Sequence, residues 1–382
     1  EDSSLSTESM TPRLSGAFGD NWSTDAGDFG FVISGSYSEQ ESVSFRPRTD
    51  RDNRVTPPTA VDPAEFLAIQ FLVQEQENYD YETVNLASTF EWAPSDKVKL
   101  NLDVVLNEQE RSQDSYRLQA SGVSALRNVS IPTAYEIVDF QVGPGLMPAA
   151  LQGTLEPDLV NVDDDDPNLR FSSDTGSRVT DSQIIALGGE WLISDRFSAR
   201  AEYATTASDT SNPNLSTTLN FINPNCPLDG TSNDNCVPFV YDLSGGTLAW
   251  GVNFNSPFAP SAADLTNPNN VVLDQVIVGR NTTENAEDAF RMDFTYDLEW
   301  QAINSVDFGF RYSDASSRFN DVEDRIGGFS QMVDSPNGSL FSELLVPGPS
   351  NFGDGDGRSL FISNFLLVDP DRAFSDPAGT LA

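Results

Sequence analysis

The side chains that could do chemistry in this sequence are carboxylates, arginines, aromatics and two cysteines. No histidine occurs among the 382 residues, so imidazole-based zinc sites and serine–histidine–aspartate triads are excluded. The sequence also shows no phosphate loop, no GxGxxG segment and no nucleophile beside a base. We therefore do not expect this chain to be an enzyme.

Two cysteines, Cys226 and Cys236, stand ten residues apart in the segment NPNCPLDGTSNDNC. An exported protein meets an oxidising compartment, where such thiols pair. Closing a loop of about ten residues would stabilise the fold by about 3 kcal/mol in the chain-entropy treatment. The sequence predicts a disulfide, and the alternative is a pair of free thiols.

Closely spaced carboxylates occur in two loop-like segments, VDDDDPN and FGDGDGR. Carboxylates with this spacing can ligate calcium through oxygen, although neither segment matches the full EF-hand pattern. The alternative, which the sequence favours, is a solvated acidic loop, and no other cofactor is expected. The residues concerned are Asp163, Asp164, Asp165, Asp166, Asp354 and Asp356.

Two further groups of side chains could contact a ligand. The aromatics of AWGVNFNSPF could stack on a sugar or an aromatic ligand, and three arginines could meet an anionic one. The favoured alternatives are aromatics that pack within a loop, and arginines in ion pairs with Glu202, Asp293 and Asp307. The candidates are Trp250, Phe254, Phe258, Arg200, Arg291 and Arg311.

The segments that must position these side chains alternate between apolar and polar residues. In AFRMDFTYDLEW, the apolar side chains from Phe290 to Trp300 share one parity, and the charged ones from Arg291 to Glu299 share the other. Side chains alternate faces along a strand, so each such segment has one apolar and one polar face. By this pattern we predict eight strands, within 13–22, 28–40, 82–92, 97–106, 183–191, 196–206, 289–300 and 306–314.

The connections between these strands alternate in length. Turns rich in turn-forming residues occupy 23–28, 93–97, 192–196 and 301–305, whereas long loops occupy about 47–79, 114–180, 208–286 and 320–382. In the first long loop, DPAEFLAIQ predicts a short helix capped by Asp62, followed by a strand from about 70. Compact soluble domains rarely carry several loops of this length, whereas outer-membrane barrels combine short turns with long loops.

The apolar faces are dominated by Phe, Tyr and Trp, and aromatics flank the short turns as an interfacial girdle would. The girdle residues are Trp22, Trp92, Trp191, Phe197 and Trp300. The fold class expected is therefore all-β: an antiparallel up-and-down portion of a transmembrane β-barrel, forming an open curved sheet. Phe290, Phe294, Phe308 and Phe310 should lie on its convex face. The alternative is a soluble β-sandwich with the apolar face inward.

Charge narrows the range of partners. Lys and Arg number 21 against 59 Asp and Glu, giving a formal net charge of -38. Phosphate binding needs clustered Lys and Arg, so nucleic acid is not an expected partner. The sequence contains no run of 18 apolar residues, so it does not predict a membrane-crossing helix. The expected partners are the lipid bilayer and a small-molecule or oligosaccharide ligand.

Two stretches carry a family resemblance, from about Thr11 to Asn320. TPRLSGAFGDNW…GDFGFVISGSYSEQESVSFRPRTDRDN and YDYETVNLASTFEWAPSDKVKLNLDVVLNEQERSQDSYRLQASGVSALRNVS resemble the barrel of TonB-dependent outer-membrane receptors. The resemblance implies a barrel of about 22 strands closed by a plug. It also implies import of a scarce ligand, of the siderophore, cobalamin or oligosaccharide class, energised through the TonB complex.

The sequence departs from that pattern at both ends. No plug-like segment precedes Thr11, and the last residues, DPAGTLA, are loop-like. We therefore expect residues 1–382 to be one partial barrel domain, with the plug and further strands missing. The alternatives are a passive porin-like channel and a secreted, soluble β-rich adhesin.

Overall fold

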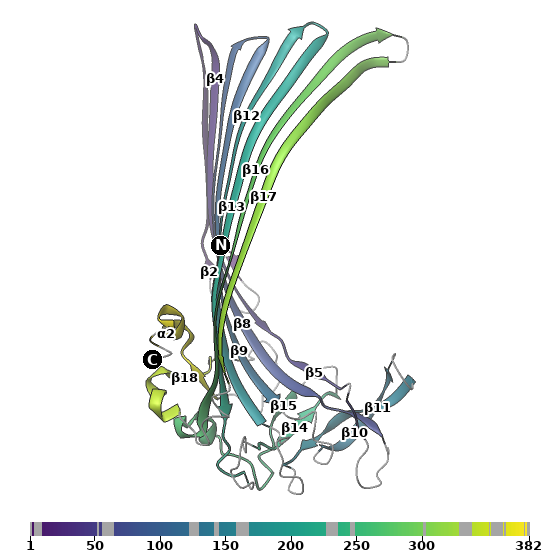
Figure 1. Cartoon of the computed structure of the whole chain (residues 1–382), viewed down its shortest axis with the longest axis vertical. Helices are drawn as coiled ribbons and strands as arrows, with labels where there is room; N and C mark the ends of the chain where they lie inside the picture. Colours follow the sequence, from purple (N-terminus) through teal and green to yellow (C-terminus); the bar gives the residue numbers. More distant parts are fainter. Residues whose placement is uncertain are drawn as a thin grey trace.

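The structure is a computed structural model in which one tall, bent sheet dominates the molecule (Figure 1). It describes residues 2–3, 10–51, 53–55, 65–121, 130–140, 145–157, 168–226, 236–244, 249–300, 303–327, 338–350, 352, 362, 364–377 and 379. In Figure 1 the short turns lie at the top, whereas the sheet that contains β10, β11, β14 and β15, together with β18 and the C-terminal helix, lies in the lower part. We call these the turn end and the loop end of the sheet.

Eight long strands in an up-and-down antiparallel order form the main sheet, β3-β4-β8-β9-β12-β13-β16-β17. Each strand pairs with the next one along this order, and the short β5 (Arg48–Asp50) adds to β8. The fold is therefore all-β, with the predicted eight strands in an open sheet. The long strands are β3 (Arg13–Thr24), β4 (Gly27–Phe45), β8 (Phe71–Ser95), β9 (Val98–Ser121), β12 (Asn168–Ser194), β13 (Phe197–Phe221), β16 (Val271–Trp300) and β17 (Ile303–Gly327).

Smaller elements gather at the loop end. Among the described residues, three small sheets, three 3-10 helices and one short α-helix form there or near the N-terminus, and β11 is central to the largest of the three sheets. In chain order the elements are β1 (Asp2–Ser3), β2 (Met10–Thr11), β6 (Asn53–Val55), β7 (Phe66–Ala68), β10 (Ser130–Phe140), β11 (Gly145–Leu155), β14 (Phe239–Asp242), β15 (Ala249–Val252), η3 (Asp264–Thr266), η4 (Pro268–Asn270), η5 (Gly338–Leu344), β18 (Leu345–Pro347), β19 (Leu366–Val368) and α2 (Pro370–Ser375).

The hydrophobic core lies at the loop end, where the connecting segments pack on the long strands. Phe171 of β12 meets Phe365 with ring centroids 5.7 Å apart, and Ser173 donates a hydrogen bond to the backbone oxygen of Val368. From β8, the buried Gln74 donates to the backbone oxygen of Trp250. These contacts join segments up to 195 residues apart in sequence into one cluster.

The predicted loops are too long in every case, because the strands continue well past the alternating segments. β4 runs to Phe45, β8 starts at Phe71, and β12 starts at Asn168. The predicted helix after Asp62 is also wrong within the described residues: Phe66–Ala68 form the strand β7 instead, while the strand expected from about 70 is present as β8. No helix in the described part of the chain is long and apolar enough to cross a membrane.

Candidate functional site

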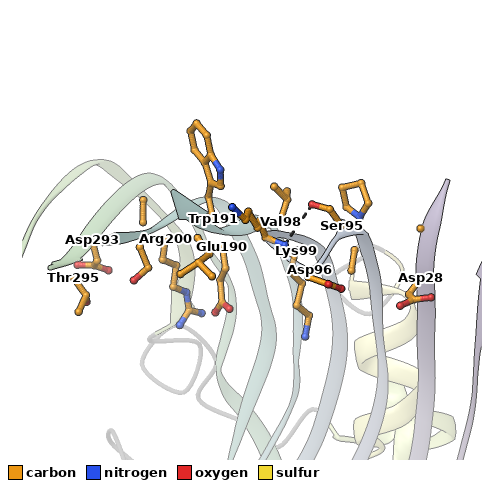
Figure 2. A pocket seen from close by; sticks show the side chains of 17 residues that line it. Asp28, Ser95, Asp96, Val98, Lys99, Glu190, Trp191, Arg200, Asp293 and Thr295 are labelled. Atoms are coloured by element: carbon orange, nitrogen blue, oxygen red, sulfur yellow. Dashed lines mark hydrogen bonds between the residues drawn. The ribbon is translucent and has the colours of Figure 1, made fainter. Parts of the chain in front are cut away.

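The two faces of the main sheet differ sharply in chemistry at the turn end. Figure 2 shows Trp191 and Val98 on the outer side of the curved sheet and Lys99, Glu190 and Arg200 on its inner side. Directly paired residues on neighbouring strands share a face of the sheet, so the strand register identifies the outer-face residues of the other strands. Trp191 pairs with Ala199, which pairs with Phe294.

The outer face therefore carries the expected aromatic surface, which remains exposed. Phe294 stacks on Phe308 at 5.0 Å between ring centroids, and Phe290 meets Phe310 at 5.8 Å. Trp191 is 56% exposed and Phe310 55%. A soluble protein normally buries such a contiguous surface. We call the outer-face apolar residues between the turns and the first carboxylate of each strand the apolar band.

The apolar band ends at a carboxylate on seven of the long strands. On β9 the outer residues run Val98, Leu100, Leu102, Val104 and Leu106, and Glu108 follows. A span of this size matches the 9–11 residues that a tilted strand needs to cross a bilayer. The first outer carboxylates are Glu39, Glu82, Glu108, Asp181, Asp209, Asp288 and Asp314.

Some of these carboxylates form a lateral row across the sheet. Glu108 pairs with Asp181, Asp181 with Asp209, and Asp209 with Glu284. Arg318 on β17 ends the row opposite Glu284. Like charges directly opposite each other destabilise a strand pair, so this acidic border costs the sheet stability. Its position at one level of the sheet gives the apolar band a sharp edge.

The inner face at the turn end holds the three arginines that the sequence offered as ligand contacts. They line, or lie beside, a hollow of about 770 Å³ that also includes Lys99, Glu190 and Asp293 (Figure 2). Each arginine has an acidic partner: Arg200 with Glu202 at 3.7 Å, Arg291 with Asp293 at 2.6 Å, and Arg311 with Glu287 at 3.1 Å. The favoured alternative of inner-face ion pairs therefore describes them, although Arg311 pairs with Glu287 and not with Asp307.

A second inner-face hollow, of about 530 Å³, lies farther along the strands toward the loop end. Arg111 and Arg178 line it and are direct partners across β9 and β12. The guanidinium of Arg111 lies over the ring of Tyr79, 4.6 Å from its centroid, and donates to the side-chain oxygen of Gln113 at 2.8 Å. Among the described residues, no carboxylate forms an ion pair with either arginine.

Two glycines belong to a row of paired residues that crosses the sheet at this second hollow. One row across the sheet runs from Gln113 through Gly176, Asn214 and Gly279 to Glu323. A Cβ at Gly176 would lie 3.0 Å from the backbone oxygen of Pro213, and one at Gly279 would lie 2.3 Å from Oδ1 of Asn214. The glycines therefore let the Asn214 side chain lie across the row, and a side chain at either position would displace its neighbours.

A buried charge cluster closes the loop end of the same face. Arg117 donates to Oε1 of Glu75 through Nε at 3.1 Å and Nη2 at 2.7 Å, and its Nη2 lies 3.6 Å from Asp174. Burial opposes ionisation of Glu75, but hydrogen bonding and charge from Arg117, with the charges of Arg48 and Arg46, lower its pKa. Burial raises the pKa of Asp174, although Ser216 and Arg117 partly offset it.

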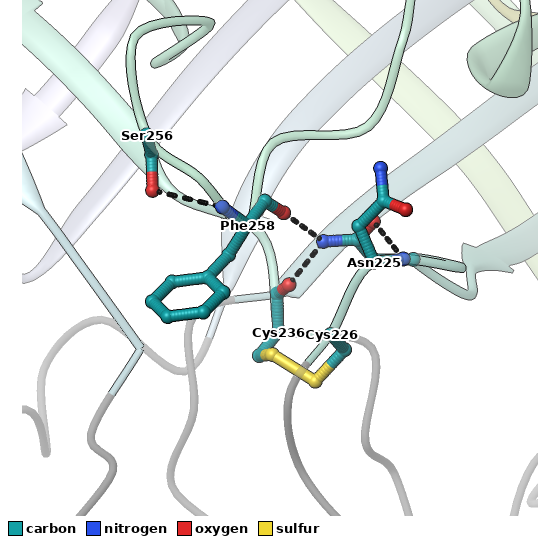
Figure 3. The surroundings of a disulfide bond; sticks show 6 residues. Asn225, Cys226, Cys236, Ser256 and Phe258 are labelled. Atoms are coloured by element: carbon teal, nitrogen blue, oxygen red, sulfur yellow. Dashed lines mark hydrogen bonds between the residues drawn. A yellow bond between two sulfur atoms is a disulfide. The ribbon is translucent and has the colours of Figure 1, made fainter.

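The two cysteines are joined in the structure by a disulfide, with Cα atoms 5.5 Å apart. Asn223 donates from Nδ2 to the backbone oxygens of Cys236 and Phe258, at 2.7 and 2.8 Å. Figure 3 shows Phe258 near the disulfide, with its backbone N–H directed at the hydroxyl oxygen of Ser256. The disulfide therefore belongs to a hydrogen-bonded loop that Phe258 helps to build.

The three aromatic side chains that were candidates for ligand contact differ in how deeply they are buried. Trp250 has no exposed surface and packs edge-on against Phe239 at 5.7 Å, which matches the alternative of an aromatic that packs within the loop. Phe258 is half-buried, whereas Phe254 is exposed and stays a candidate. The calcium candidates, Asp163 to Asp166 with Asp354 and Asp356, lie outside the described residues.

Sequence reasoning missed the second hollow entirely. Arg111 lies between the predicted strand 97–106 and the predicted loop 114–180, whereas Arg178 and Tyr79 lie within the predicted loops 114–180 and 47–79. Continued alternation in NYDYETV, with Tyr79 and Tyr81 on the inner parity, was the one available signal. Their meeting depends on the register of β8, β9 and β12, which the sequence alone does not supply.

Comparisons of this chain with protein-family models, curated proteins and solved structures find no match.

Proposed function

We propose that this chain is part of the wall of an outer-membrane receptor of the TonB-dependent kind, which captures a scarce ligand on its inner face and lets it pass. The observation that carries the proposal is the apolar band. It is exposed, aromatic, about as tall as a bilayer-crossing strand, and bounded by carboxylates on seven strands. Lipid is the solvent in which such a surface is stable.

The rest of the architecture supports the same proposal. Short turns join the strands at one end, and long segments with their own packed core lie at the other. Transmembrane barrels have this asymmetry, with the longer loops on the outside of the cell. The inner face is polar and carries hollows at several levels, as the wet, ligand-binding lumen of a barrel would.

The side chains of the inner face favour a receptor over an enzyme. The described part of that face offers arginines, carboxylates, amides and tyrosines, which bind ligands through hydrogen bonds and charge. Its ion pairs hold arginines and carboxylates in place without an adjacent nucleophile. Capture and gated passage of a siderophore, cobalamin or oligosaccharide therefore fit this face better than bond-making chemistry.

Tryptophan quenching by brominated lipid tests the membrane assignment. Two variants of the full-length protein, one retaining only Trp191 and the other only Trp250, are reconstituted into vesicles whose acyl chains carry bromine. Trp191 lies in the apolar band and should be quenched, whereas Trp250 is buried at the loop end and should not. Equal quenching of the two, or recovery of the protein in the soluble fraction without detergent, would contradict the proposal. The second result would favour the soluble adhesin.

A further inference from the structure

The hollow of about 530 Å³ on the inner face contains two arginines, neither of which has a carboxylate partner among the described residues. Arg111 and Arg178 are direct cross-strand partners on one face. Two like charges in this position repel each other. Arg291 and Arg311 at the turn end are also direct cross-strand partners, but each of them is paired with an acid. The chain has 59 acidic residues against 21 basic ones, so a neutralising carboxylate could readily have stood beside Arg111 and Arg178.

The carboxylates that do line this hollow are engaged by other arginines. Asp174 lies 3.6 Å from Arg117, and Glu323 lies 3.4 Å from Arg325. The inner-face arginines at the turn end are each matched by an acid as well. Within the part of the chain that the structure describes, Arg111 and Arg178 thus differ from Arg117 and Arg325, and from the three arginines at the turn end, because neither has a carboxylate partner.

The guanidinium of Arg111 is held in place. It lies over the Tyr79 ring at 4.6 Å and within 5.9 Å of the Tyr81 ring centroid, and its Nη2 donates to Gln113. A guanidinium fixed in this way keeps its remaining donors in a planar fork that fits an oxyanion. The cation–π contact also reduces the entropy lost when a ligand binds.

The surroundings of the pair call for a ligand rich in hydrogen-bonding groups. Gln113, Asn212 and Asn214 line the hollow together with Gly176, and the Asn214 side chain lies over Gly279. Amide side chains both donate and accept, as hydroxyl groups do. Among the described residues no aromatic ring lines the hollow, so a flat apolar ligand would find little to stack on. The volume lies within the usual range for small-molecule sites.

We propose that Arg111 and Arg178 form the anion-binding centre of a site for an acidic oligosaccharide, one that carries carboxylate or sulfate groups on hydroxylated rings. The acidic group lies between the two guanidiniums, and the amides of Gln113, Asn212 and Asn214 bind the ring hydroxyls. This inference rests on the proposed function, because it names the ligand class that the receptor would capture. Of the three ligand classes in the proposed function, which are siderophores, cobalamin and oligosaccharides, the site favours the oligosaccharides.

Calorimetric titration of the full-length protein tests the site, with the protein purified from whichever cell fraction holds it. The probes are trigalacturonate, a sulfated trisaccharide, the neutral maltotriose and inorganic sulfate. We expect one acidic trisaccharide or both to bind, at least tenfold more tightly than either maltotriose or sulfate. Binding should weaken as salt is added, because the ion pairs are screened.

Arginine variants locate the binding. Arg111→Gln and Arg178→Gln should each weaken acidic trisaccharide binding at least tenfold. The matched control is Arg318→Gln, which removes an exposed arginine from the outer face of the same sheet and should leave the affinity unchanged. Circular dichroism and gel mobility before and after heating check that each variant keeps its fold.

Four results would overturn the site. They are no binding of either acidic sugar, equal binding of maltotriose, equal binding of sulfate alone, and an equal loss of affinity in the Arg318→Gln control. None of them depends on where the protein resides. A soluble protein that binds as expected would refute the membrane assignment and leave this site standing, and a lipid-exposed protein that binds neither acidic sugar would do the reverse.

Discussion

Trp191 and Phe171 lie on the same face of strand β12, twenty positions apart, in opposite environments. The ladder between β12 and β9 runs from Asn168 to Trp191 without a register shift, so the even separation places both side chains on one side. Trp191 is 56% exposed, whereas Phe171 is fully buried against Phe365. One face of one strand therefore meets the chain's own segments at the loop end and has no protein cover at the turn end.

A charge placed on that uncovered stretch should be costly if lipid covers it. Leu187→Arg is expected to lower the free energy of unfolding by about 2–4 kcal/mol in a bilayer, the usual cost near the bilayer midplane. The matched control is Ala186→Arg, one residue away on the inner face and opposite Asp103. Urea unfolding in lipid vesicles measures both. Similar costs for the two variants would show that the apolar band does not face lipid.

The acidic row at the edge of the apolar band should be a source of instability. Asp181 lies directly between Glu108 and Asp209 on neighbouring strands. Asp181→Asn removes two like-charge contacts and should raise the free energy of unfolding by about 0.2–1 kcal/mol. Its benefit should shrink as salt screens the carboxylates. A destabilised variant, or a gain insensitive to salt, would mean that the carboxylates do not repel one another in the native protein.

The sequence predicts the strands of the sheet well where one face of each strand is apolar and the other is polar. Around Leu102 and Asp103 the alternation is regular, and that stretch lies at the turn end with no cover on either side. Alternation fails at Ser172 and Ser173, which are adjacent and both buried, because protein covers both faces at the loop end. The strands therefore extend far beyond the segments that alternation marks.

Burial of Trp250 shows a second limit. Its neighbours AWGVNFN look like an exposed loop, yet β15 pairs with β14 and Trp250 enters the core beside Phe239. That pairing depends on tertiary packing between segments that no local pattern connects. The same is true of Arg111 and Arg178, whose position opposite one another comes from a register that spans 67 residues of chain.

The disulfide should stabilise the loop-end core and not the apolar band. Replacing both cysteines, Cys226→Ser with Cys236→Ser, should lower the free energy of unfolding of the loop end by about 3 kcal/mol, the chain-entropy cost of a loop of this length. Limited proteolysis near Asn223 should become faster, while the hairpins at the turn end stay protected. Mass mapping without reductant should give one Cys226–Cys236 peptide pair in the native protein. Free alkylated thiols at both positions would refute the pairing.

Asp114 should make the stability of the loop end fall as pH rises. Burial and the nearby charges of Asp371 and Asp80 raise its pKa above the ordinary 3.8, despite a hydrogen bond from Thr175. The folded state therefore holds the proton more tightly than the unfolded chain does, and stability declines as pH rises from about 3.8 through the folded pKa. Asp114→Asn keeps an acceptor for Thr175 and should be more stable than the native protein at pH 7, with the difference vanishing below about pH 4. A difference that persists at low pH would exclude this cause.

The two edges of the main sheet should prevent residues 1–382 from closing a barrel by themselves. Among the described strands, β3 pairs only with β4 and β17 only with β16, so each has one edge that no described strand covers. In hydrocarbon each unpaired backbone group costs several kcal/mol. If the eight strands have the curvature of the wider barrel that we propose, their two edges cannot meet in the native register. Expressed alone and refolded into detergent, these residues should aggregate or pair edge to edge, and should conduct no ligand. Electrophoresis without heating is the measurement, and a sharp heat-modifiable monomer band with reproducible single-channel conductance would show that the eight strands close unaided.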